Sequence, residues 1–94
     1  MKFSIIIPNW NGEKLLKKNL PAVFSSGADQ VVVVDNGSND GSVALLKNLQ
    51  AQYSQLKIIF NPKNLGFARA VNQGVKEAKN EIVALLNNDV VPEK

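Results

Sequence analysis

Residues 30–41 read QVVVVDNGSNDG, in which four consecutive valines run directly into acidic, amide, glycine and serine side chains. An unbroken apolar run is typical of a strand that is buried on both faces of a parallel sheet. The residues that follow it are common turn formers, which end a strand abruptly. This stretch therefore predicts an α/β fold in which a polar loop follows the carboxyl end of a buried strand.

Three more β-rich segments lie along the chain, and helical patterns separate them. The expected strands are residues 3–7, 30–34, 57–60 and 81–86, and the expected helices are residues 13–26, 41–53 and 67–78. We expect Pro21 to kink the first helix or to start a new turn, Gly27 to end it, and Asp40 to cap the second helix. The alternation of strands and helices predicts right-handed crossovers and a Rossmann-like, mostly parallel sheet with flanking helices.

Composition restricts the chemistry of such a fold. The 94 residues allow one domain, and no apolar run reaches the roughly 20 residues that span a bilayer. Without a recognisable secretory signal, a cytoplasmic location is expected, at the inner face of the membrane as one option for the full-length protein. The chain has no cysteine and no histidine, so carboxylates must do any acid–base or metal work. Its lysines are scattered, which predicts no nucleic-acid partner.

Polar residues follow all four expected strands, and open α/β sheets bind ligands beyond the carboxyl ends of their strands. Asp35 could present its carboxylate to a ligand or belong to a tight turn, and Asp89 could hold Mg²⁺ or Mn²⁺ or belong to a polar turn. Trp10 is the only tryptophan, and we expect it to be exposed and able to stack on a nucleobase. Neither a G-x-G-x-x-G sequence after the first strand nor a Walker A lysine is present, which disfavours dinucleotide-dependent dehydrogenases and P-loop proteins.

Together, the strand ends resemble the nucleotide-binding half of the family 2 glycosyltransferases of the GT-A fold, over nearly the whole chain. Residues 4–11 are similar to the opening strand of the family with its Pro-x-aromatic-Asn ending, and residues 34–42 to its acidic-Gly-Ser-x-Asp-Gly-Ser segment. Residues 61–74 are similar to its Asn-x-Gly helix start, and residues 85–89 lie where its Asp-x-Asp metal motif falls. The resemblance implies that residues 1–94 are the N-terminal, donor-binding part of a longer glycosyltransferase domain, ending shortly after the metal motif.

The resemblance also implies an activity and a set of site residues. The enzyme would transfer a sugar from a nucleotide-diphosphate sugar donor to an acceptor hydroxyl, with inversion, in polysaccharide or cell-surface glycan synthesis. Trp10 would stack on the base, Asp35 and Asn36 would hydrogen-bond to it, Asn88 would lie beside the ribose, and Asp89 would ligate the Mg²⁺ or Mn²⁺ that bridges the diphosphate. The implied donor contacts are Pro8, Asn9, Trp10, Asn11, Asp35, Asn36, Ser38, Arg69 and Asn88.

Three residues depart from the pattern of the family. Asn36 and Asn87 stand where the family often has Asp, although an amide oxygen can accept a hydrogen bond from a base and Mg²⁺ needs only one or two carboxylates. Arg69 lies two residues before the usual arginine, so it either faces the diphosphate or belongs to a solvated helix face. The carboxylate general base of an inverting enzyme is expected beyond Lys94, so these residues alone should be inactive.

Two other functions stay open. A non-catalytic nucleotide-binding module would use Asp89 only as part of a turn. A receiver-like signalling domain needs an acidic pair after the first strand and a phosphoacceptor Asp after the third, but Pro8, Asn9, Asn61 and Pro62 occupy those positions. The sequence does not predict whether the acceptor is a glycan or a lipid-linked sugar. A fourth strand at the edge of the sheet would favour self-association through that edge.

Overall fold

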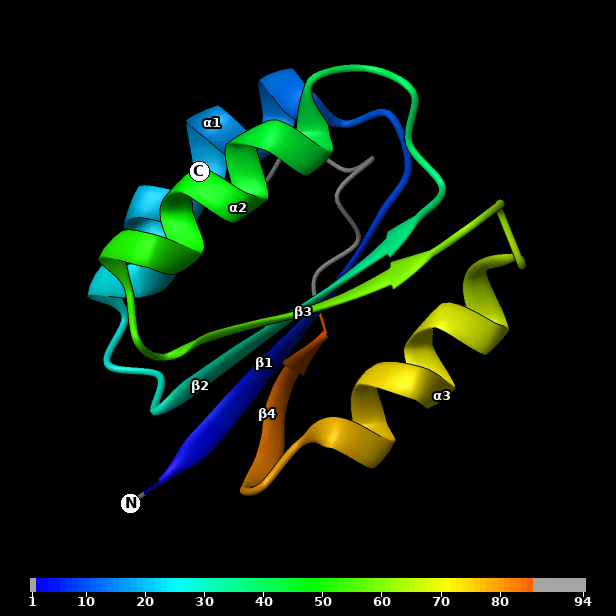
Figure 1. Ribbon diagram of the computed structural model, residues 1–94. Coiled ribbons are helices and arrows are strands. Elements are labelled where there is room, and N and C mark those ends of the chain that lie inside the picture. The colour runs from blue at the N-terminus through cyan, green and yellow to red at the C-terminus, as the bar shows by residue number, and fades with distance from the viewer. Residues whose placement is uncertain (1, 86–94) are drawn as a thin grey trace.

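The computed structural model describes residues 2–85 as an α/β fold of four strands and three helices (Figure 1). The elements are β1 (Phe3–Asn9), α1 (Glu13–Ser25), β2 (Gln30–Asn36), α2 (Ser42–Gln52), β3 (Leu56–Asn61), α3 (Phe67–Glu77) and β4 (Glu81–Leu85). The predicted order of strands and helices is confirmed, and the ends of the elements differ by one or two residues. Within the described residues, no helix is long and apolar enough to cross a membrane.

The strands form one parallel sheet in the order β3-β2-β1-β4. The two central strands run two residues further than predicted, to Asn9 and Asn36. They do so because polar residues continue the pairing, Asn9 with Asp35 and Asn36 with Asn61. Several residues that we assigned to loops therefore belong to strand ends, where the sheet holds them in register. In the described part of the sheet β4 is an edge strand, as predicted.

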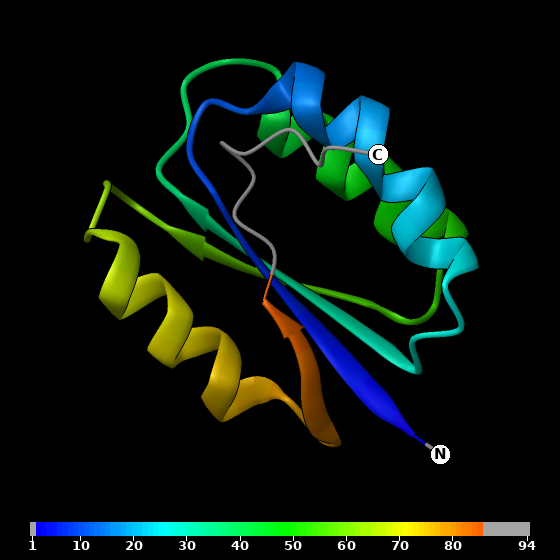
Figure 2. The same cartoon turned by 180° about the vertical axis from the view of Figure 1, so that it is seen from behind.

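Helices cover both faces of the sheet, with α1 and α2 on one face and α3 on the other (Figures 1 and 2). Val31 and Val33 pack in one apolar cluster with residues of α1 and α2, whereas Val32 and Val34 pack in a second cluster with Ala70 of α3. Because successive strand residues point to opposite faces, a strand covered on both sides needs an apolar residue at every position. This requirement explains the run of four valines in β2.

Small residues bring α3 close to the sheet. Ala70 and Gly74 are its buried residues, and a Cβ atom at Gly74 would lie only 2.5 Å from Cγ2 of Ile6. Phe67 and Val75, two larger apolar residues of this helix, are about half exposed. The close approach leaves room beneath the helix for Ala and Gly, so the larger side chains project past the contact.

Helix α1 also differs from the prediction, because it runs through Pro21 as one continuous α-helix. Its end agrees with the prediction, since Gly27 follows in the left-handed region at φ +91°. Glycine adopts this conformation without the steric cost that a Cβ atom imposes.

A candidate donor site at the carboxyl ends of the strands

Ser38 joins the loops that follow β1 and β2. Its hydroxyl donates a hydrogen bond to Oδ1 of Asp35 at 2.7 Å and accepts one from the backbone N–H of Asn11 at 2.8 Å. Nδ2 of Asn9 donates to the same Asp35 oxygen at 2.9 Å and lies 3.4 Å from the Ser38 hydroxyl. Four of the predicted donor contacts, from two separate strand ends, therefore form one hydrogen-bonded group, which we call the Ser38 junction: Asn9, Asn11, Asp35 and Ser38.

The junction explains the conformation of Asn11. This residue has φ +51°, in the left-handed region that asparagine tolerates better than most residues. Its side-chain oxygen accepts the backbone N–H of Asn39 at 2.8 Å. Asn11 thus bonds to the β2–α2 loop through both its backbone and its side chain, which offsets the cost of the unusual backbone angle.

Trp10 lies between two residues that the junction holds. Asn9 and Asn11 flank it, and both are bonded to Ser38. The indole itself is 52% exposed, which confirms the expectation that it is not a core residue. Pro8, one residue earlier, is buried in β1. The backbone on either side of Trp10 is therefore fixed while its ring is open to a planar ligand.

The carboxylate of Asp35 is only 1% exposed and is bonded internally. Oδ1 accepts from Asn9 and Ser38, and Oδ2 accepts the backbone N–H of Ser38 at 3.1 Å. A buried carboxylate requires such donors, because desolvation of an unpaired charge is costly. Since two carboxylate oxygens offer about four lone-pair sites, Oδ2 retains the capacity to accept one more hydrogen bond.

Asn36 points to the opposite face of the sheet from Asp35. Its Nδ2 donates to the carbonyl of Gly66 at 3.2 Å, and its Oδ1 accepts the backbone N–H of Leu65 at 3.3 Å. Oδ1 also accepts Nδ2 of Asn61 at 3.0 Å. The side chain is 4% exposed, and these partners all belong to the chain itself. Asp35 and Asn36 thus serve two different faces of the sheet.

The partners of Asn36 were not predicted from the sequence. Asn61, at the end of β3, forms a reciprocal amide pair with Gln73 of α3, through bonds of 2.7 and 2.9 Å. Asn36 and Asn61 are register partners on neighbouring strands. Two amides just beyond the ends of the predicted strands 30–34 and 57–60 were the available signal for this contact.

Gly37 brings the β2–α2 and β3–α3 loops together. It has φ +75°, and a Cβ atom there would lie 2.5 Å from Cα of Lys63. Only glycine satisfies both the backbone angle and this close approach. A pocket of about 360 Å³ opens beside the contact. It is lined by Asp35, Gly37, Ser38, Val43, Lys47, Phe60, Asn61 and Pro62.

Lys47 is the cation of this pocket. Its ammonium lies 5.7 Å from the ring centroid of Phe60, within the range of a cation–π contact. The Phe60 ring is 42% exposed. The pocket therefore combines an exposed aromatic surface, a positive charge and the buried carboxylate of Asp35.

Arg69 lies apart from the Ser38 junction. It is exposed on α3 and lines a separate hollow of about 290 Å³ together with Leu65, Asn72, Gln73 and Lys76. The structure brings Asn9, Asn11, Asp35 and Ser38 together and leaves Arg69 outside that group. Its role at the diphosphate stays a prediction.

Asn87, Asn88 and Asp89 lie outside the described residues. Within residues 2–85, no cluster of three or more acidic side chains could hold a metal ion. The carboxylates of Asp35 and Asp40 already accept hydrogen bonds from neighbouring N–H and O–H groups. Asp89 therefore remains the predicted metal ligand.

Asp40 and Glu13 connect the starts of α1 and α2. Asp40 accepts the N–H groups of Glu13 and Ser42 at 3.1 and 2.9 Å, and Glu13 accepts the N–H of Gly41 at 2.9 Å. The N-cap position of α2 is Gly41 and not Asp40, which was the predicted cap. The Asp40 carboxylate still accepts the N–H of Ser42, the first residue of the helix, from the position before the cap. Burial acts to raise the pKa of Asp40, but hydrogen bonds from Ser42 and the N–H of Glu13 outweigh it, so the pKa is lowered.

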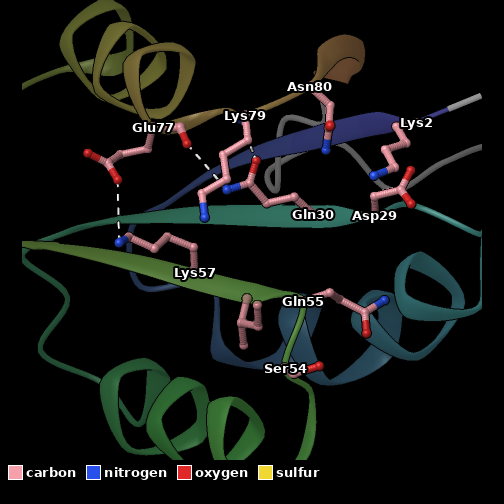
Figure 3. A pocket seen from close by; sticks show the side chains of 10 residues that line it. Lys2, Asp29, Gln30, Ser54, Gln55, Lys57, Glu77, Lys79 and Asn80 are labelled. Carbon is pink, nitrogen blue, oxygen red and sulfur yellow. Dashed lines mark hydrogen bonds and ion pairs between the residues drawn. The ribbon is translucent and has the colours of Figure 1, made fainter.

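Figure 3 shows a second pocket, of about 450 Å³, at the amino ends of the strands. Gln30, the first residue of β2, makes three hydrogen bonds there. Its Oε1 accepts the hydroxyl of Ser4 at 3.0 Å and the N–H of Lys79 at 2.8 Å, and its Nε2 donates to the carbonyl of Glu77 at 3.2 Å. These bonds tie the end of α3 to the sheet, at the side opposite the Ser38 junction.

Comparison with known proteins identifies the class. The family model for glycosyl transferase family 2 matches residues 4–94, so the chain belongs to this family. It is 33% identical over 93 residues to the glycosyltransferase AglE of Haloferax volcanii, a match that covers 95% of this chain and 31% of AglE. The predicted family and fold class are confirmed.

Two solved structures are similar to the chain. The S. aureus TarS 1–349 structure in complex with UDP superposes with a TM-score of 0.81 at 29% identity, over 95% of this chain and 28% of that one. The mannosyltransferase PcManGT from Pyrobaculum calidifontis, in complex with GDP-Man and Mn²⁺, superposes with a TM-score of 0.79 at 19% identity, which shows a shared fold, over 99% of this chain and 29% of that one. The chain thus spans about a third or less of the length of these proteins.

Proposed function

We propose that the chain is the donor-binding part of a glycosyltransferase that transfers a sugar from a nucleotide-diphosphate donor to an acceptor hydroxyl. The observation that carries this proposal is the Ser38 junction, which joins the ends of β1 and β2 and leaves the Trp10 ring exposed beside it. The complexes of TarS with UDP and of PcManGT with GDP-Man support a donor of this chemical class.

Each residue of the junction has a role in this proposal. The ring of Trp10 stacks on the base, a contact that tolerates any base because every base has a π-face. Oδ2 of Asp35 accepts a hydrogen bond from the base edge. Ser38, Asn9 and Asn11 hold these two groups in place.

The diphosphate end of the donor requires a cation. We assign Mg²⁺ or Mn²⁺ to Asp89, with Asn88 beside the ribose, and the PcManGT complex with Mn²⁺ supports a cation in this fold. When bound, the cation supplies Lewis-acid stabilisation of the charge on the departing nucleoside diphosphate. We expect the general base to lie beyond Lys94, which makes residues 1–94 inactive without further sequence.

The remaining context of the enzyme is also proposed. Similarity to relatives such as the putative glycosyltransferase TagX of Staphylococcus aureus supports sugar transfer, and we propose polysaccharide or cell-surface glycan synthesis as its setting. For this setting we also propose an inverting reaction and a glycan or lipid-linked acceptor. We propose a cytoplasmic location, at the inner face of the membrane. Self-association through the β4 edge would be recognised as a dimeric mass in light scattering.

The test of the donor site is a fluorescence titration. Trp10 is the only tryptophan, so its emission reports on this strand end alone. UDP, dTDP and GDP are added in turn with Mn²⁺ to the wild type and to Asp89→Ala. We expect a saturable change with at least one nucleotide that is lost or strongly weakened in Asp89→Ala.

Glu77→Ala is the matched control, since it removes a carboxylate at the opposite end of the sheet that only pairs with Lys57 at the surface. It should bind like the wild type. A flat response to all three nucleotides would contradict the base-stacking role. In the full-length protein, binding of donor without any transfer or hydrolysis would favour a non-catalytic nucleotide-binding module.

A further inference from the structure

We infer that Asn36, Asn61 and Gln73 form an amide relay that positions the β3–α3 loop at the donor site, and that Asn36 acts in this relay instead of contacting the base. The inference rests on the proposed donor-binding function. It changes the role of Asn36 and adds two residues, from β3 and α3, to the machinery of the site.

Two backbone groups fix the direction of every hydrogen bond in the amide relay. The N–H of Leu65 requires an acceptor and the carbonyl of Gly66 requires a donor, so Asn36 must present Oδ1 to the first and Nδ2 to the second. Because Oδ1 of Asn36 is an acceptor, Asn61 must offer it Nδ2, and the orientation of Asn61 in turn sets that of Gln73. The order of donors and acceptors is thus determined from one end to the other.

The hydrogen-bonding capacity of Asn36 argues against a contact with the base. An amide oxygen has two lone pairs, and those of Asn36 are used by Leu65 at 3.3 Å and Asn61 at 3.0 Å. Asn36 is also not among the residues that line the pocket beside the junction. Asp35, the preceding residue, keeps acceptor capacity and lines the pocket on the other face.

The relay acts on the loop between β3 and α3, which borders the pocket. Leu65 and Gly66, which Asn36 holds, directly precede the first residue of α3. Earlier in the same loop, the backbone of Lys63 lies against Gly37, which lines the pocket. A shift of residues 63–66 would therefore disturb the contact that fixes Gly37 in the pocket wall.

An amide is required because Asn36 both donates and accepts. In Asn36→Asp, one oxygen could still accept from Leu65 and Asn61, but the other would face the carbonyl of Gly66. Protonation of the introduced carboxyl group would restore a donor there. Burial raises the pKa of such a group, so the defect should shrink as the pH falls.

The charges around this position do not supply another explanation for such a pH response. On the surrounding elements, β1 has no ionisable side chain, and β3 has only Lys57 at its opposite end. On α3, Arg69 is exposed near the start, and the other two ionisable groups lie in the last two positions. Lys63 is exposed, and Asp35 bonds on the other face of the sheet.

Gln30 supplies a matched control at the other end of the same helix. It also accepts one backbone N–H and donates to one backbone carbonyl, and it is similarly buried. Gln30→Glu makes the same chemical change where no donor contact is proposed. Loss of α3 anchoring alone would affect both variants alike.

The experiment compares wild type, Asn36→Asp and Gln30→Glu at pH 7.5 and pH 5, first without ligand and then with UDP or GDP and Mn²⁺. Hydrogen exchange of the Leu65 amide reports on the loop without any nucleotide. We expect faster exchange only in Asn36→Asp, together with about a tenfold loss of nucleotide affinity at pH 7.5 that narrows to about threefold at pH 5. Gln30→Glu should lose stability but keep wild-type affinity at both pH values.

Equal losses of affinity in both variants, or a loss in Asn36→Asp that does not depend on pH, would overturn the inference. If Asn36→Asp does not fold, Gln73→Glu tests the far end of the relay, because the introduced oxygen would face Oδ1 of Asn61. We expect faster exchange of the Leu65 amide in this variant. Exchange that is unchanged or slower than in the wild type would overturn the inference. If the wild type binds no nucleotide, the proposed donor function fails, while the exchange data still decide whether the relay holds the loop.

Discussion

Gln30 and Asn36, the first and last residues of β2, hold the two ends of α3 with the same chemistry. Each side-chain amide accepts one backbone N–H and donates to one backbone carbonyl, Gln30 beyond the end of the helix and Asn36 just before its start. The eleven residues of α3 span about 16 Å, somewhat less than the roughly 20 Å between the first and last of the seven residues of β2, so both ends of the helix lie within reach of that strand. The two end residues of β2 thus fix where α3 lies along the strand and in which direction it runs.

Replacement of Gly37 by Ala should disrupt the carboxyl edge. The added Cβ would lie 2.5 Å from the backbone of Lys63, and the residue has φ +75°. Gly27→Ala is the control, since it has φ +91° with nothing within 4 Å of the added atom. We expect Gly27→Ala to cost about 1–2 kcal/mol of unfolding free energy from the backbone angle alone, and Gly37→Ala to cost more, in urea denaturation. Equal costs would show that the contact between the loops is not tight.

Removal of the Ser38 hydroxyl should weaken the junction between β1 and β2. Ser38→Ala leaves Asp35 without one donor and the N–H of Asn11 without its acceptor. Loss of hydrogen bonds to a buried charge predicts a decrease of about 1–3 kcal/mol in unfolding free energy, and a weaker Trp10 response to nucleotide. Ser25→Ala, an exposed position at the end of α1, should be neutral. Unchanged stability and binding in Ser38→Ala would contradict the role of the junction.

Trp10 should contribute to binding and not to folding. Because its ring is 52% exposed, Trp10→Ala is expected to leave the unfolding free energy unchanged within about 0.5 kcal/mol. Loss of one base stack is worth about 1–3 kcal/mol, so nucleotide affinity measured by calorimetry should fall about tenfold or more. Phe67→Ala removes an aromatic ring of similar exposure elsewhere and should bind normally. A parallel loss in both variants would point to a nonspecific effect.

Asp40 should make stability depend on pH in the acid range. Its pKa is lowered from the usual 3.8, so its stabilising contribution is present above that value and is lost as the pH falls through the folded-state pKa. Asp40→Asn should therefore reduce stability at pH 6 and show a shallower decline between pH 4 and pH 2 than the wild type. Denaturation midpoints across this range provide the measurement, and parallel curves for the two proteins would contradict the assignment.

Local sequence was sufficient to predict the strands, the helices and the strand ends that carry the polar residues. The valine run indicates that both faces of β2 are covered, because successive strand residues point to opposite faces and all of these are apolar. The four motifs at residues 4–11, 34–42, 61–74 and 85–89, taken together and in order, were likewise sufficient to predict the family, since each is contiguous in the chain. Exposure of Trp10 followed from its position between two asparagines.

Only the tertiary structure decided what each polar side chain contacts. Asp35 and Asn36 are neighbours in the chain, and their resemblance to an acidic pair suggested one shared role, but the alternation of the strand sends them to opposite faces. Their partners, Ser38 and Asn9 on one side and Asn61 and Gly66 on the other, are set by the register between strands. Register depends on how all the layers pack together, so local composition cannot specify it. The sequence thus determined which residues reach the functional edge, and packing decided which of them face a ligand and which hold the others in place.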